Sequence, residues 1–171
     1  MGLFGFLTGR KSPLAGVVRQ DAATLRAALL AVARDSAPFT VRDGGPEGCD
    51  LLAEWRIVDA AWYEVFAKAG ISKVSQVLMR IDAVAGQVRS VDRDFSVAWR
   101  AGVPSLTLAA AGFRGQQVGM SFGAAYAFRE DDLRFGKVYQ YRFNSAEMKG
   151  PLQAAALAAG WGWKPVAFGR L

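Results

Sequence analysis

Arg142 and Gln140 are the residues of this chain best suited to orient a small anionic ligand. A guanidinium beside an amide can hold a carboxylate or phosphate group. If Arg129 faces Gly136 across a hairpin, Arg142 falls opposite Gly123, next to a strip of small residues. This pairing predicts five ligand-binding positions, namely Gly119, Ser121, Gly123, Gln140 and Arg142.

The hairpin that must position these residues spans residues 117–143. Its first strand alternates large apolar residues with Gly119, Ser121, Gly123, Ala125 and Ala127. In the expected register Tyr126 pairs with Tyr139 and Phe122 with Phe143, which forms an aromatic layer on the other face. Two alternatives stay open for the small-residue strip: an open ligand pocket, or close packing against a late helix.

The N-terminal segment combines apolar and basic residues in a way that favours contact with a membrane surface or a protein groove. Several glycines and Pro13 predict an irregular arm over residues 1–20. Trp161 and Trp163 flank a glycine after a predicted helix end, and we expect them to add to the contact surface. The predicted contact residues are Leu3, Phe4, Phe6, Leu7, Arg10, Lys11, Trp161 and Trp163.

The absence of histidine and the single cysteine exclude several kinds of chemistry. Without histidine there is no Ser-His-Asp or Cys-His system and no usual zinc sphere. Cys49 lies between Glu47 and Asp50 in the neighbouring sequence, where negative charge raises the pKa of a thiol, so we expect a passive thiol. No nucleotide-binding fingerprint is present, and we predict no cofactor and no catalytic residue.

Three acidic groups were candidates for cation ligands, because hard cations require several converging oxygens. None has the spacing of an EF-hand, so we expect solvated turns and strand edges and predict no metal site. The three groups are Glu130 to Asp132, Asp92 with Asp94, and Asp43, Glu47 and Asp50.

Composition places the chain among ordinary globular proteins. It has 171 residues, 52% of them apolar, and a net charge of +6. No apolar run is long enough to span a membrane, and the first residues fit neither a signal peptide nor a myristoylation motif. We therefore expect a cytoplasmic protein, with peripheral membrane attachment as a candidate.

Periodicity predicts the elements of the first half of the chain. A helix is expected over residues 21–34, capped by Asp21, and a second over residues 59–70. Alternation predicts strands at 39–42, 51–57 and 77–82, with Leu51, Ala53 and Trp55 facing inward.

In the second half of the chain, apolar and polar residues continue to alternate. Strands are expected at 91–100, with Asp92 and Asp94 facing outward, and near Leu106 and Leu108. The hairpin follows, and Pro151 and Gly160 bound an Ala-rich helix that is apolar nearly all round and therefore buried. The sum is an α+β domain over residues 21–171, with one antiparallel meander of about seven or eight strands. The alternative is a sheet curled into a barrel around the late helix.

Three functional hypotheses follow. The favoured one is a non-enzymatic binding or adaptor domain, attached to a membrane surface or protein partner by its N-terminal arm. The second is an enzyme or small-molecule binder that uses the small-residue face. A nucleic-acid binder is the weakest, because basic residues do not run together with interleaved aromatics.

Overall fold

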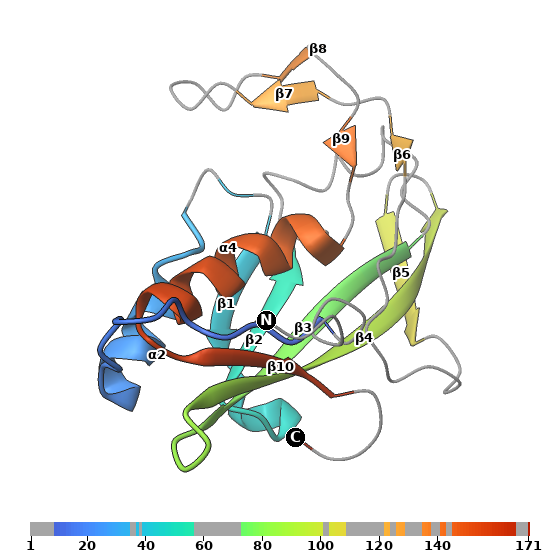
Figure 1. Cartoon of the computed structure of the whole chain (residues 1–171). Coiled ribbons are helices and arrows are strands. Elements are labelled where there is room, and N and C mark those ends of the chain that lie inside the picture. Colours follow the sequence, from blue (N-terminus) through green and yellow to red (C-terminus); the bar gives the residue numbers. More distant parts are fainter. Residues whose placement is uncertain are drawn as a thin grey trace.

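In the part of the chain that the structure describes, the protein has an α+β fold in which two helices pack on an open, mixed sheet (Figure 1). The computed structural model describes residues 9–34, 37, 39–56, 73–100, 103–108, 122–123, 126–128, 135–137, 141–142, 145–166 and 171. The predicted helix at 59–70 lies outside these residues. Within them, no helix combines the length and apolar character needed to cross a membrane.

The main sheet has six strands, and its order explains why it is mixed. Five strands follow the order β1-β2-β3-β4-β10, and β5 also pairs with β4. Because β3 and β5 both pair with Phe95 and Ser96, β5 and β3 lie on opposite edges of β4. The strands are β1 Phe39–Asp43, β2 Leu51–Trp55, β3 Lys73–Asp82, β4 Gln87–Arg100, β5 Val103–Leu108 and β10 Gly162–Pro165.

The prediction of a purely antiparallel meander is wrong at the last strand. β10 runs parallel to β4, with Trp163 beside Val88 and Lys164 beside Arg89. A parallel pair requires a long crossover connection, usually containing a helix, and the chain between β4 and β10 includes α4. The described sheet is also open, so it does not close into the alternative barrel.

Helix α2, Ala22–Leu30, begins where the sequence predicts. The Asp21 carboxylate accepts a hydrogen bond of 2.8 Å from the Thr24 backbone N–H, which satisfies one free donor of the first turn. Leu25 and Leu29 are buried on the predicted apolar stripe. The helix ends at Leu30, four residues before the predicted end.

Helix α4, Ser145–Ala158, begins six residues before Pro151, which therefore lies inside the helix rather than in its first turn. The predicted burial on all sides is also wrong. One face is buried, while Gly150, Pro151, Ala154 and Ala158 on the other are exposed. The buried side chains are Met148, Lys149, Leu152, Gln153, Ala156 and Ala159.

The C-terminal end of α4 turns the chain back onto the core. Gly160 has φ +77°, and the N–H groups of Gly160 and Trp161 bond to the oxygens of Leu157 and Ala156. This pairing is a Schellman motif, for which glycine is favoured because it adopts the left-handed conformation without strain. The turn buries the following side chain, since Trp161 is 2% exposed.

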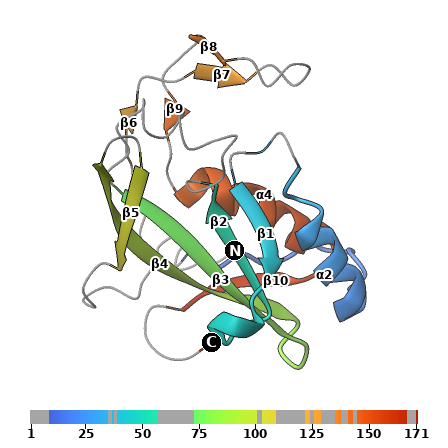
Figure 2. The same cartoon turned by 180° about the vertical axis from the view of Figure 1, so that it is seen from behind.

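The core lies between the two helices and one face of the sheet. Val77, Met79 and Val88 are buried there with residues of α2 and α4, and the inward positions Leu51, Ala53 and Trp55 are confirmed. On the opposite face, which Figure 2 shows in front of α4, Leu52, Leu78 and Cys49 form a smaller apolar cluster with Leu171 packed against it.

The 117–143 region forms two short ladders rather than one long hairpin in the main sheet. β6, Phe122–Gly123, pairs with β9, Tyr141–Arg142, and β7, Tyr126–Phe128, pairs with β8, Phe135–Lys137. Tyr126 lies opposite Lys137, so the predicted Tyr126–Tyr139 pairing is wrong. Two residues separate β6 from β7 but three separate β8 from β9, and this difference puts the ladders out of step by one residue.

Candidate functional site

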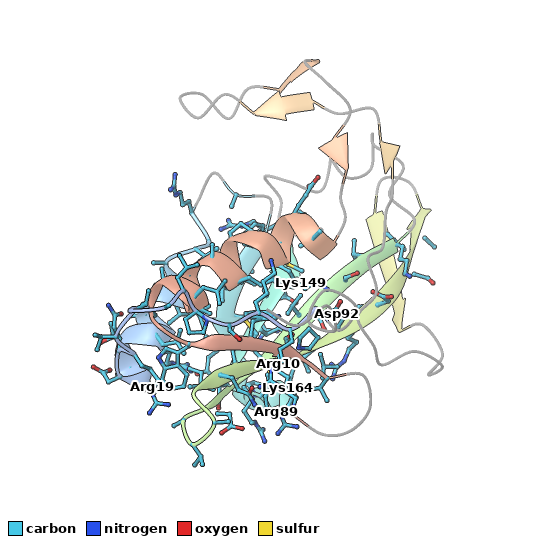
Figure 3. All side chains as sticks on the ribbon, in the orientation of Figure 1. Arg10, Arg19, Arg89, Asp92, Lys149 and Lys164 are labelled. Atoms are coloured by element: carbon cyan, nitrogen blue, oxygen red, sulfur yellow. The ribbon has the colours of Figure 1, made fainter. Side chains whose placement is uncertain are left out.

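Basic residues from four neighbouring segments form a row across the sheet. Arg80 on β3 lies opposite Arg89 on β4, and Arg89 lies beside Lys164 on β10. An antiparallel bridge joins Lys11 to Trp163, which places Arg10 next to Lys164 (Figure 3). We call Arg10, Lys164, Arg89 and Arg80 the basic row.

The row lies on the face of the sheet opposite α2 and α4. Residues directly opposite each other on paired strands share a face, and neighbours along a strand alternate between faces. Met79 and Val88 point into the core under α4, so Arg80 and Arg89 point the other way. Lys164 and Arg10 are exposed to solvent, where they are accessible to a large anionic partner.

Like charges on directly opposing strand positions repel each other, and a nearby anion lowers this repulsion. Arg80 donates to the main-chain oxygens of Leu171, at 2.7 Å, and Gly48, at 2.5 Å. Among the described residues, Arg10 and Lys164 form no ion pair.

Two carboxylates border the row, and backbone groups engage both. Asp50 accepts a bond of 2.7 Å from the Ile81 N–H, and Asp82 accepts one of 2.9 Å from the Ala85 N–H in the β3–β4 turn. Each carboxylate therefore organises a chain reversal or strand start. The row can attract phosphate or carboxylate groups.

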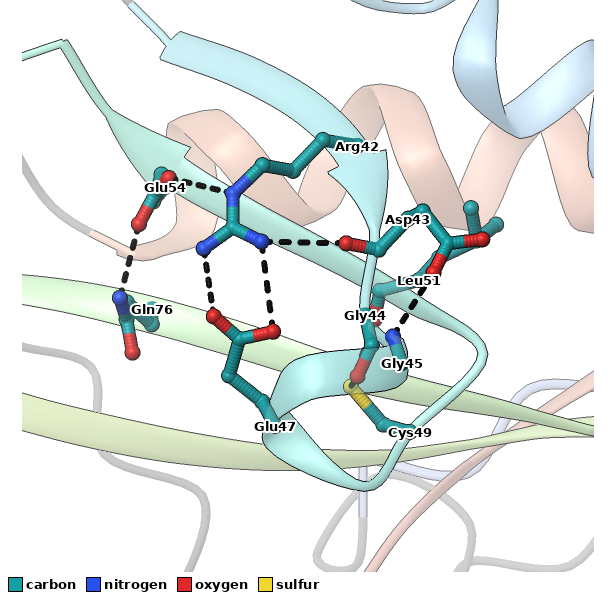
Figure 4. Close-up of polar contacts among 9 residues, drawn as sticks. All are labelled: Arg42, Asp43, Gly44, Gly45, Glu47, Cys49, Leu51, Glu54 and Gln76. Carbon is teal, nitrogen blue, oxygen red and sulfur yellow. Dashed lines mark hydrogen bonds and ion pairs between the residues drawn. The ribbon is translucent and has the colours of Figure 1, made fainter.

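The acidic loop at 43–50 has a different organisation, which Figure 4 shows. Arg42 binds both oxygens of Glu47, at 2.6 and 3.2 Å, and also donates to Glu54 at 2.9 Å. These two carboxylates raise the pKa of Arg42, and the bond from Arg42 lowers the pKa of Glu47. The network is charge-paired and holds the 3-10 turn η1, Gly45–Glu47, against β1.

The acids of this loop do not converge as metal ligands. Asp43 accepts bonds from the Gly45 N–H and from Arg26, and the first of these is the main cause of its lowered pKa. Glu47 accepts hydrogen bonds from Arg42, and Asp50 accepts one from the Ile81 N–H. In the described part of the chain no group of acidic or cysteine side chains is arranged to hold a metal ion.

Cys49 is buried, and the single hydrogen of its thiol has two main-chain oxygens within hydrogen-bond distance, those of Gly44 and Leu51. Burial is the main cause of its raised pKa, and the charges of Glu47 and Asp50 add to it. A protonated, enclosed thiol is a poor nucleophile, which agrees with the predicted passive role.

A buried ion pair joins α4 to β4. Its carboxylate is that of Asp92, which the sequence predicted to face outward. Lys149 binds Asp92 at 2.5 Å, with only 7% and 4% of their side chains exposed. The outward prediction for Asp92 is therefore wrong. Next to it, Asp94 accepts a bond from Ser75 at 2.6 Å and pairs with Lys73 at 2.9 Å. A lysine 57 residues away in sequence neutralises Asp92, and local alternation carries no signal of it.

The structure separates the predicted contact residues into three groups. Leu3, Phe4, Phe6 and Leu7 lie outside the described residues, whereas Arg10 and Lys11 lie on the edge of β10. Trp161 and Trp163 are 2% and 0% exposed, so their predicted contact with a partner is wrong. They are buried because the turn at Gly160 and the pairing of β10 direct them into the core.

The predicted ligand pocket loses its basis in the observed register. Arg142 lies opposite Phe122, and Gly123 lies opposite Tyr141, so Arg142 is not the partner of Gly123. Gly119, Ser121 and Gln140 lie outside the described residues, as does the acidic group Glu130 to Asp132.

Comparison with known proteins gave no match to a family model, to a curated protein or to a solved structure. Sequence reasoning had selected Arg10 and missed Lys164, Arg89 and Arg80, because only strand pairing brings residues 10, 80, 89 and 164 together.

Proposed function

We propose that this protein is a non-enzymatic binding domain that attaches to an anionic membrane surface through the basic row. The observation that carries the proposal is the register that aligns Arg10, Lys164, Arg89 and Arg80 on the face of the sheet opposite α2 and α4. A membrane is favoured over a nucleic acid because the segment directly before Arg10 is rich in Leu and Phe.

The electrostatic attraction expected for such a surface is substantial. Each basic side chain near an anionic leaflet contributes about 1 kcal/mol, and the effect fades within about one Debye length. Several cations at adjacent positions of one rigid sheet act on the same patch of lipid. Binding should therefore fall steeply with salt, and it should require anionic lipid.

The test is co-sedimentation with vesicles of phosphatidylcholine, with and without about 30 mol% phosphatidylserine. Replacing both exposed members of the row, Arg10→Gln with Lys164→Gln, should weaken binding about 20-fold. Arg34→Gln, an exposed arginine beyond α2, is the matched control and should keep most of the binding. Equal binding to neutral and anionic vesicles, or equal loss in the control, would contradict the proposal.

A further inference from the structure

Exposed apolar side chains occur in two turns of the described part of the chain. Among the described residues, four large apolar side chains are exposed: Leu14 at 74%, Val17 at 39%, Val18 at 84% and Val84 at 99%. Three belong to the arm and one to the β3–β4 turn, 66 residues further along the chain. Single exposed apolar residues are ordinary, but two neighbouring turns that present several of them offer a contact surface.

Two glycine-containing turns project these side chains. In the arm, the Val17 N–H bonds to the Leu14 oxygen at 3.2 Å, and Gly16 between them has φ +86°, as in a type II turn. In the β3–β4 connection, Gly86 has φ +62° and Val84 stands at the tip. Both turns are fixed by backbone geometry, so their apolar residues are held in place before any partner arrives.

Arg19 joins the two turns. Its guanidinium donates to the Ala83 oxygen at 3.4 Å and stacks over the Trp161 ring at 5.3 Å. Its backbone packs on Gly160, where an added Cβ would lie 2.7 Å from the Arg19 Cα. The residue before Arg19 is Val18 and the residue after Ala83 is Val84, so this contact joins the two segments that carry the exposed apolar side chains.

The charges around these turns are mainly positive. Arg19 is part of the surface, and the basic row begins two residues behind the turn, at Arg80 and Arg89. The nearby acids are Asp82, bound to the Ala85 N–H, and Asp21, which caps α2 through Thr24. Apolar tips flanked by cations match the chemistry of an anionic bilayer, whose headgroups are negative and whose acyl region is apolar.

We infer that Leu14, Val18 and Val84 insert into the interface of an anionic membrane while the basic row holds the headgroups. This inference rests on the proposed function and specifies its orientation: the end of the molecule that carries both turns faces the lipid. It places the anchoring on the folded body, independently of the segment before residue 9.

Environment-sensitive fluorescence tests the orientation. In a Cys49→Ser background, Val84→Cys carries the fluorophore, and Ala154→Cys on the exposed face of α4 is the matched control. With vesicles containing about 30 mol% phosphatidylserine, we expect a blue shift and quenching by brominated lipid at position 84 only. The same response at both positions, or at 154 alone, would overturn the inference.

Removal of the apolar side chains tests their contribution. The triple variant Leu14→Ser, Val18→Ser, Val84→Ser should bind these vesicles about tenfold more weakly, with an unchanged melting temperature because all three side chains are exposed. Wild-type affinity in the triple variant, together with weak binding after Arg10→Gln and Lys164→Gln, would reject insertion and keep the proposed function.

Failure of the wild-type chain to bind anionic vesicles would reject both the insertion and the proposed function. Concentration-dependent dimerisation that the triple variant abolishes, without any vesicle response, would identify a second copy as the partner and reject insertion.

Discussion

The sheet carries two kinds of charged group, which differ in how their charges are balanced. Arg42 is held between Glu47 and Glu54, and Lys149 is buried against Asp92. In the basic row, by contrast, Arg80 and Arg89 face each other as like charges. The paired groups satisfy one another within the chain. In the row, cations occupy neighbouring positions on adjacent strands, and a bound external anion would lower the repulsion between them.

Breaking the buried pair should have the largest effect on stability. Lys149→Ala leaves the Asp92 carboxylate buried without its cation, and the expected loss is about 3–5 kcal/mol of unfolding free energy. Chemical denaturation measures it. A matched double variant, Lys149→Met with Asp92→Leu, should recover most of the loss, because two apolar side chains leave no charge in the core. A loss of unfolding free energy well below this value in Lys149→Ala would show that the two charges interact as weakly as a surface ion pair.

The half-exposed Arg42 network should give an intermediate effect. Arg42→Met removes bonds to two carboxylates, but solvent screens these charges, so the expected loss is about 1 kcal/mol near neutral pH. Denaturation midpoints of the variant and the wild-type protein provide the measurement. Lys73→Met, which removes one exposed partner of Asp94, is a suitable comparison and should lose less.

The same network predicts a pH dependence. Arg42 lowers the pKa of Glu47 in the folded state, so its stabilisation is present above the ordinary value of 4.5 and is lost as the pH falls through the lowered pKa. Wild-type stability should therefore fall more steeply below pH 4.5 than that of Arg42→Met. If the stability of the two proteins changed with pH in the same way, the bond between Glu47 and Arg42 would contribute nothing to folding stability.

The basic row should give the smallest change in stability, with the opposite sign. Lys164→Gln removes repulsion from Arg89 and Arg10, and stability at low salt should stay equal or rise by up to about 0.5 kcal/mol. Added salt should stabilise the wild-type protein more than this variant. A clear loss of stability in Lys164→Gln would show that the row is a structural feature like the Arg42 network.

Local sequence patterns predicted the parts of the fold that depend on nearby residues. Asp21 caps a helix with Leu25 and Leu29 buried, and β2 shows the expected inward alternation. Asp92 was placed on the wrong side because Val91, Phe95 and Val97 are apolar at alternate positions. Val97 is indeed buried, but the neutralising Lys149 lies on a distant helix.

The candidate site required long-range pairing that no local signal encodes. Arg10 stood out in the sequence because apolar residues precede it, yet its neighbours Lys164 and Arg89 follow only from the parallel alignment of β10 with β4. The hairpin register failed for a related reason: the strand segments differ in spacing by one residue, and a one-residue shift changes every partner.

The bridge between Lys11 and Trp163 also has a consequence for how the chain folds. It joins positions 152 residues apart, and the edge of β4 at Gln87 to Ser90 has no β10 partner until residues 162–165 exist. Pairings between such distant positions form slowly, because a long loop must close first. During synthesis the helix α2 and the β3–β4 hairpin can form early, whereas the row of cations is completed among the last steps. A nascent chain would therefore complete the basic row only after residues 162–165 have been made.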